Sequence, residues 1–150
     1  MKWLLALLAA LSLSACVSLD LADEDDTPKT APAQVGIVNH TGNYIYSASV
    51  NGAGGGNMSA WSAGTANICC ASIPMVWRPG LKARVRWNMP IGTKDVIKEK
   101  IVEVEKYDRP GSIYLHFFPN DEVRVIVVSK LGPHHPNYPI ALPVKPSNAK

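Results

Sequence analysis

Cys16 is the residue whose surroundings most clearly predict a chemical modification. It follows one N-terminal cation, Lys2, then the apolar stretch from Trp3 to Leu11, and then small residues. This order is typical of a secretory signal peptide, and the apolar stretch is too short to span a bilayer as a helix. We therefore predict that residues 1–15 are a signal peptide.

The run Leu13-Ser14-Ala15-Cys16 resembles the lipobox of bacterial lipoproteins. This resemblance implies a thioether-linked lipid on Cys16, with cleavage before it; an ordinary signal peptide with an incidental cysteine is the alternative. Several acyl chains would anchor the protein durably, because each buried methylene contributes about 0.8 kcal/mol. Val17 stands where an aspartate would resemble an inner-membrane retention signal, so we expect an outer-membrane anchor facing the periplasm.

The other two cysteines, Cys69 and Cys70, are adjacent in the sequence. Neighbouring cysteines rarely reach ordinary disulfide geometry, because one peptide unit holds their Cα atoms too close together. We therefore expect two half-buried thiols on a strand, one on each side. A vicinal or intermolecular disulfide is the alternative in an oxidising compartment. No cysteine and histidine spacing suggests zinc, and we expect neither a metal nor a cofactor.

The sequence carries no recognisable catalytic set. It has no GxSxG motif, and the glycine-rich run from Asn51 to Asn57 lacks the ending of a phosphate-binding loop. His116 lies in an apolar strand and is expected to pack there rather than act as a base. His40 lies in a turn, and His134 and His135 lie in a proline-rich tail. We expect that the chain is not an enzyme.

Charge and proline content divide the chain into segments. Five acids lie between Asp20 and Asp26, so residues 27–150 hold 14 basic against 7 acidic side chains. We predict a lipidated, disordered acidic linker over 16–34, one folded domain over 35–130 and a proline-rich tail over 131–150. The tail should dock, if at all, through side chains such as Tyr138 and Ile140. A nucleic-acid partner is not expected, because basic and aromatic residues do not interleave.

Short β-prone segments separated by turn signals dominate the domain. The segment from Leu81 to Asn88 alternates most clearly, and the segment 122–129 becomes apolar on both sides, which favours a central strand. The pattern predicts an all-β fold, a single antiparallel β-sandwich, with a partly open barrel as the alternative. The seven predicted strands are 35–38, 44–50, 67–73, 81–88, 97–107, 113–118 and 122–129.

Aromatic and basic side chains near the turns favour recognition of a protein. We expect Trp87 and one tyrosine in the core, and Trp61 and Trp77 more exposed in loops. In the alternative, Arg84 and Arg86 only pair with Glu103 and Glu105 across strands. The candidate partner-binding residues are Trp61, Trp77, Arg78, Lys82, Arg84 and Arg86.

Residues 35–130 resemble the DUF3304 family of small bacterial lipoproteins. The resemblance is carried by Asn39-His40-Thr41, Tyr44-Ile45-Tyr46, the run from Ser49 to Asn57, Cys69-Cys70, Trp77-Arg78-Pro79-Gly80 and Val85-Arg86-Trp87. Members often occur beside type VI secretion phospholipase effectors and resemble the lipoprotein immunity proteins that neutralise them in the periplasm. The resemblance thus implies a secreted phospholipase as partner. A structural or assembly lipoprotein of the envelope or secretion apparatus, and a small-ligand carrier, are the alternatives.

Overall fold

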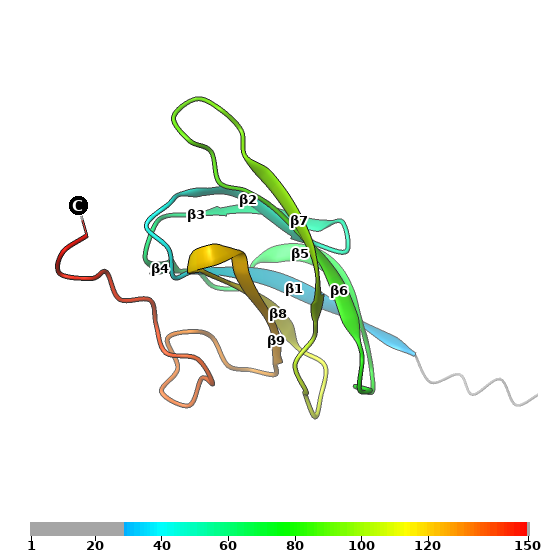
Figure 1. Ribbon diagram of the computed structural model, residues 1–150. Helices are drawn as coiled ribbons and strands as arrows, with labels where there is room; N and C mark the ends of the chain where they lie inside the picture. Colours follow the sequence, from blue (N-terminus) through cyan, green and yellow to red (C-terminus); the bar gives the residue numbers. More distant parts are fainter. Residues whose placement is uncertain (1–28, 150) are drawn as a thin grey trace, which may run out of the picture.

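A computed structural model describes residues 29–149, which fold as an all-β domain (Figure 1). Each strand is short, and one 3-10 turn, η1 (Pro119–Asp121), joins the last two. The strands are β1 (Thr30–Asn39), β2 (Ile45–Val50), β3 (Ala53–Met58), β4 (Ser62–Ala63), β5 (Ile68–Pro74), β6 (Lys82–Asn88), β7 (Ile97–Glu103), β8 (Ser112–Phe118) and β9 (Glu122–Val128).

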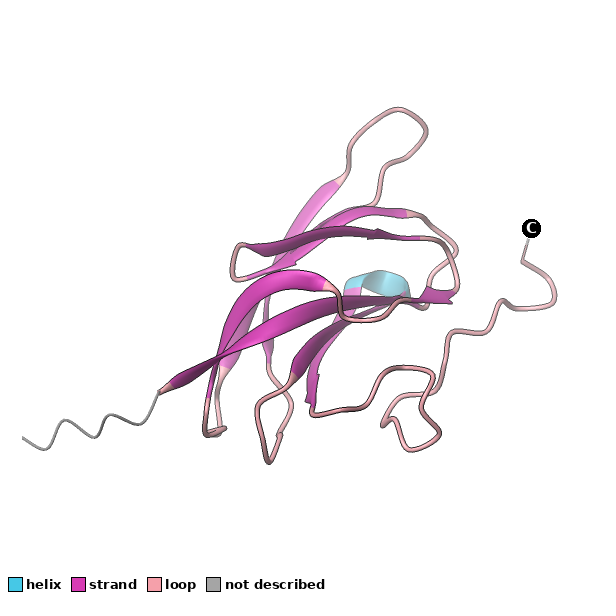
Figure 2. Ribbon diagram, turned by 180° about the vertical axis from the view of Figure 1, so that it is seen from behind, coloured by secondary structure: helices cyan, strands magenta, loops and turns pink. Residues whose placement is uncertain are grey.

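The strands form two sheets that face each other as an open sandwich (Figures 1 and 2). One sheet has the order β4-β1-β8-β9, with β5 also paired to β1. The other has the order β3-β2-β6-β7. The sandwich prediction is confirmed, and the described strands do not close into a barrel.

Strand β1 pairs with β8 in parallel, from Val35 opposite Ile113 to Asn39 opposite Phe117. The first sheet is therefore mixed, because it contains this parallel pair beside antiparallel ones. Between β1 and β8 the chain passes through the whole second sheet. That passage supplies the long connection that a parallel pair requires.

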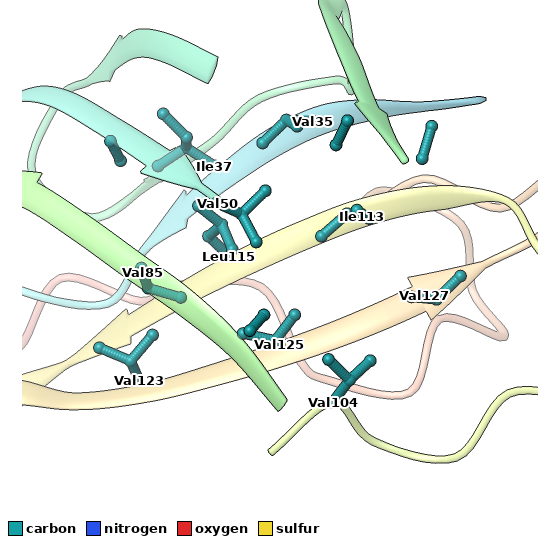
Figure 3. Close-up of a cluster of buried hydrophobic side chains, with 14 of the residues drawn as sticks. Val35, Ile37, Val50, Val85, Val104, Ile113, Leu115, Val123, Val125 and Val127 are labelled. Atoms are coloured by element: carbon teal, nitrogen blue, oxygen red, sulfur yellow. The ribbon is translucent and has the colours of Figure 1, made fainter. Parts of the chain in front are cut away.

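The core lies between the two sheets and consists mainly of branched aliphatic side chains (Figure 3). Val35 and Leu115 from the first sheet and Val85 from the second are fully buried. Burying one such side chain contributes about 1.5–3 kcal/mol. The alternation predicted for β6 is confirmed, because Ala83, Val85 and Trp87 all face this core.

Strand β1 begins at Thr30, so the predicted linker boundary at residue 34 is wrong. Thr30 pairs with Pro74, and Ala33, opposite Ala71, is buried. Pro32 is tolerated because this half of β1 pairs only with β5, which leaves one backbone edge without a ladder. The rest of the predicted linker, including Cys16, lies outside the described residues.

The glycine-rich run forms an edge strand, β3, where the sequence indicated only a loop. Asn51 and Gly52 have positive φ values of 51° and 83°, as the tight turn of the β2–β3 hairpin requires. Gly56 lies so close to the side chain of Ile68 that a Cβ atom would collide with it. Glycine is needed here for close packing, which β propensity does not reveal.

Strand β9 is the last strand of its sheet, so the prediction that it is central is wrong. Its second apolar side is explained by the C-terminal tail, because Ile126 packs beneath Tyr138 and Ile140. Its outer edge meets residues 104–105, where the amide of Glu105 donates to the carbonyl oxygen of Val125 at 3.0 Å. Docking of the tail through Tyr138 and Ile140 is confirmed, since both are buried.

Candidate functional site

The outward side of the sheet β3-β2-β6-β7 carries the basic residues that the sequence singled out. Lys82, Arg84 and Arg86 alternate with the buried residues of β6 and are all exposed. No segment in the described part of the chain packs over them, in contrast to the other sheet (Figures 1 and 2). We call this side the open face, and its members are Tyr46, Ser47, Ser49, Lys82, Arg84, Arg86, Ile97, Glu99 and Ile101.

Two adjoining hollows make the open face uneven. One, of about 550 Å³, lies over β6 and β7 beside Arg84, and the other, of about 410 Å³, lies toward Tyr46 and Ile97. Ser49, Gly52 and Arg86 border both hollows. The hollows exist because small residues of β2 and β3 stand next to long residues of β6 and β7. A protruding side chain of a partner could enter them.

The charges of the open face are only partly paired with one another. Arg84 Nε lies 3.6 Å from Glu99 Oε1, and both side chains are about half exposed or more. Arg86 stands opposite Glu99 in the strand register, yet among residues 29–149 no carboxylate lies within ion-pair distance of it. The open face thus keeps a cation available to an acidic partner group.

The predicted pairing of Arg84 and Arg86 with Glu103 and Glu105 is wrong. Glu105 instead binds Arg124 of β9, with hydrogen bonds of 2.6 and 3.0 Å. Glu103 stands opposite Lys82 in the register. The cause is the length of β7, which ends at Glu103, so that Glu105 leaves the sheet and turns toward β9.

Large apolar side chains are exposed on the open face as well. Tyr46 is 60 %, Ile97 52 % and Ile101 56 % exposed. Ile101 lies directly opposite Arg84, and Ile97 lies opposite Asn88. Apolar anchors beside arginines are a combination that binding hot spots favour. Sequence reasoning missed the two isoleucines. Their spacing of two residues from the charged Glu99 could have indicated that all three lie on the outward side of one strand.

The two tryptophans proposed as anchors do not lie on the open face. Trp77 packs against the core, and its indole Nε1–H donates to the carbonyl oxygen of Val104 at 2.9 Å. Trp61 is half-buried beside β4 and close to Gly42, on the edge of the other sheet. Arg78 is exposed in the turn before β6, where Gly80 has a φ of 81°. The six candidates therefore do not form a single site.

A hydrogen-bonded chain of three side chains lies on the opposite sheet. His40 Nε2 and His116 Nδ1 are 3.0 Å apart, and His116 Nε2 lies 2.8 Å from the Tyr138 hydroxyl. Burial, followed by the nearby charges of His40 and Arg124, lowers the pKa of His116 from 6.5 to about 3. Burial also raises the pKa of Tyr138.

This hydrogen-bonded set of side chains fastens the tail to the sheet. His116 is 0 % exposed, as expected for a packed histidine, and cannot meet a substrate. His40 stacks on Phe118 with ring centroids 4.2 Å apart. Among the described residues, no serine, threonine or cysteine side chain is hydrogen-bonded to either ring.

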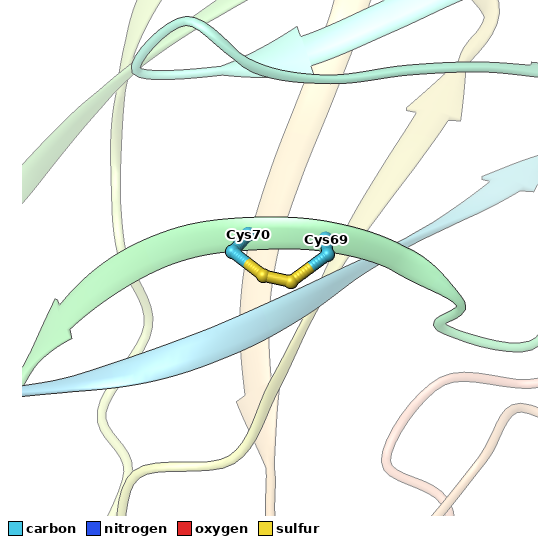
Figure 4. Close-up of a disulfide and its surroundings, with 2 residues drawn as sticks. All are labelled: Cys69 and Cys70. Carbon is cyan, nitrogen blue, oxygen red and sulfur yellow. A yellow bond between two sulfur atoms is a disulfide. The ribbon is translucent and has the colours of Figure 1, made fainter.

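Cys69 and Cys70 are bonded to one another as a vicinal disulfide on β5 (Figure 4). Both residues are exposed, so the expectation of half-buried thiols facing opposite sides is wrong. The β1–β5 register shifts opposite them, between Ala33 and Val35. The register irregularity turns both residues outward, which an alternating strand pattern does not predict.

Between residues 29 and 149, no group of three histidine, cysteine, aspartate or glutamate residues could hold a metal ion. Over the same span, no helix has the length and apolar character needed to cross a membrane.

Comparison with known proteins places this open sandwich in a family. Residues 38–125, more than half of the chain, match the model of the family described as protein of unknown function (DUF3304). The chain therefore belongs to the DUF3304 family. The matched segment runs from the end of β1 to the middle of β9 and includes the basic strand β6, whereas the tail lies outside it. No curated protein and no solved structure matches the chain.

Proposed function

We propose that this protein is a lipid-anchored, periplasm-facing immunity protein that binds and neutralises a type VI secretion phospholipase. The observation that carries the proposal is the open face, where exposed cations, exposed aliphatic side chains and two hollows lie side by side. Exposed aliphatic side chains that are grouped on one sheet face beside cations are an arrangement that a protein partner would cover. The family resemblance indicates a secreted phospholipase as the partner. The lipobox indicates that the two proteins meet in the periplasm, at the membrane that holds the lipid anchor.

The open face favours a protein partner over a small ligand. Both hollows are shallow and open to solvent, and the space between the two sheets is filled by packed side chains (Figure 3). Small-molecule sites are usually enclosed enough to bury most of the ligand. An open, mixed polar and apolar face of several strands is instead typical of a protein interface.

The direct test is co-purification of the chain with a phospholipase encoded beside its gene, followed by measurement of lipid hydrolysis. Arg86→Ala and Ile101→Ala should each weaken the complex by about thirtyfold or more, which corresponds to about 2 kcal/mol. Arg109→Ala is the matched control, because Arg109 is exposed in the loop between β7 and β8 and lies outside the open face. Absence of a complex, and no protection of cells, would leave the structural lipoprotein as the better proposal.

The anchor is tested separately from the partner. Cys16→Ala should abolish incorporation of labelled palmitate and release the protein from membranes. The melting temperature should not change, because we predict that the acidic linker separates the lipidated cysteine from the folded domain. A variant that still carries lipid would contradict the lipobox interpretation without affecting the proposal for the open face.

A further inference from the structure

The connection between β6 and β7, residues 89–96, is a hairpin that projects beyond both sheets (Figures 1 and 2). We call it the finger. Its tip is a two-residue turn, in which the amides of Ile91 and Lys94 donate to each other's carbonyl oxygens at 2.9 and 3.1 Å. Gly92 supplies the positive φ of 59° that this turn contains. The finger therefore holds a defined conformation although little of it is packed.

The base of the finger is fixed by one buried side chain. Asn88 donates from Nδ2 to Asp95 Oδ1 at 2.8 Å, and its Oδ1 accepts from the amide of Val96 at 3.0 Å. Asn88 is only 5 % exposed. It thus joins the two arms of the hairpin where they leave the sheet. A loop that is ordered before binding loses less entropy when it binds.

The tip of this ordered finger presents an apolar side chain to water. Ile91 is 74 % exposed, whereas Met89 and Pro90 behind it are half-buried. Ile97, also exposed, begins β7 directly after the finger and belongs to the open face. The apolar surface therefore continues from the tip onto the open face, and a partner seated on the open face would meet both.

Resting on the proposed function, we infer that the finger inserts Ile91 into the apolar cleft through which the phospholipase admits an acyl chain. A branched aliphatic side chain on a rigid projection matches a cleft lined for hydrocarbon. A bilayer is a poorer match, because the charged side chains of Lys94 and Asp95 lie in the same hairpin as Ile91 and would lose their water on insertion.

The experiment separates plugging of the cleft from simple binding. All chains carry Cys16→Ala so that they can be studied in free solution. A candidate phospholipase effector is assayed with p-nitrophenyl butyrate, a small soluble ester, and with phospholipid vesicles. If the finger fills the cleft, the wild-type chain inhibits hydrolysis of both substrates and competes with the ester. A chain that merely kept the enzyme away from lipid would leave ester hydrolysis at its full rate, and this result would overturn the inference.

Variants of the tip complete the test. Ile91→Asp and the uncharged Ile91→Ser should each weaken inhibition of ester hydrolysis at least thirtyfold, whereas Ile91→Val should stay within threefold of wild type. The matched control is Val76→Asp, because Val76 is 68 % exposed and lies before β6, at the opposite end of that strand. Equal melting temperatures would verify folding.

The outcomes also distinguish the two proposals. Failure of the wild-type chain to form any complex would overturn the proposed function and, with it, the role of the finger. A normal complex with inhibition that is indifferent to Ile91 would overturn only the finger. Binding of the chain to the vesicles alone, lost in Ile91→Asp, would assign the tip to the membrane, and self-association lost in the same variant would assign it to a second copy.

Discussion

The outward sides of the two sheets differ, because the C-terminal tail covers one of them and not the other. On the sheet that contains β8 and β9, the tail covers Val38, Tyr114 and Ile126 and is fastened by the histidine chain. On the sheet that contains β6 and β7, exposed isoleucines stand uncovered beside arginines. We call the first side the covered face. The tail covers one side through Leu131, Tyr138 and Ile140, whereas apolar surface stays bare on the other side, which is the arrangement expected when a partner covers it.

Acid should weaken the covered face first, and this is the largest effect that we expect. The pKa of His116 is about 3 in the folded state and 6.5 as a reference, so the unfolded chain binds more protons between these values. The contribution of neutral His116 to the free energy of unfolding is complete above pH 6.5 and is lost as the pH falls toward 3. At about 1.4 kcal/mol per pKa unit, the loss approaches ~5 kcal/mol. Urea denaturation across this range measures it, and His116→Gln should flatten the curve. An equally steep curve for this variant would contradict the assignment.

Removing the side chain that closes the covered face should have the next largest effect. Tyr138→Ala deletes a buried ring and leaves His116 Nε2 without its partner, so we expect a loss of about 3–4 kcal/mol in the free energy of unfolding. Tyr138→Phe removes only the hydroxyl and should cost about 1–2 kcal/mol. Denaturant titration measures both. If Tyr138→Ala also abolished partner binding under conditions in which the variant remains folded, the division between covered and open faces would be wrong.

The stability of the open face should depend on close backbone approach at its edge rather than on packed side chains. At Gly54, φ is 128° and a Cβ atom would lie 2.6 Å from the carbonyl oxygen of Ala48. Gly54→Ala should therefore cost about 2–3 kcal/mol of stability. Gly55 also has a positive φ, of 116°, but faces open space, so Gly55→Ala is the matched control at about 1 kcal/mol. Thermal melting compares them, and equal losses would show that the contact with Ala48 does not matter.

Strong alternation let the sequence predict both the sandwich and the basic part of the open face. In β6, period-two alternation placed Arg84 and Arg86 outward without reference to any other strand. The docking of Tyr138 was also predicted correctly, because isolated apolar residues in a polar tail are a local signal.

The errors arose where distant segments decide the environment. Strand β9 was interpreted as central because its own sequence cannot show that the tail covers Ile126. Trp77 was predicted to be exposed in a loop, because the acceptor of its indole N–H, the carbonyl oxygen of Val104, is remote in sequence. The finger was not recognised at all, although Pro90 and Gly92 between two β-prone segments are turn signals and Asn88 stands at its base. Only the fold reveals that this turn projects.

A pair of arginines, one on each side of the sandwich, should give the smallest and most discriminating effect. Arg124, bound by Glu105 through two hydrogen bonds, lies on the sheet of the covered face. Arg84 lies on the open face, 64 % exposed, with a single 3.6 Å ion pair to Glu99. Arg124→Ala should lower the free energy of unfolding by about 1 kcal/mol, and Arg84→Ala by less than about 0.5 kcal/mol.

Partner association should reverse the order of these two variants. Arg84→Ala should slow association with the phospholipase at low salt, and the difference should shrink as ionic strength rises, because exposed charges act mainly by steering and are screened. Arg124→Ala should leave the association rate unchanged, because its guanidinium is already committed to Glu105. Stopped-flow or surface-based kinetics at two salt concentrations measure both rates. An association rate that responds to Arg124 and not to Arg84 would move the interface to the other sheet, since a charge can steer only the partner that approaches its own side.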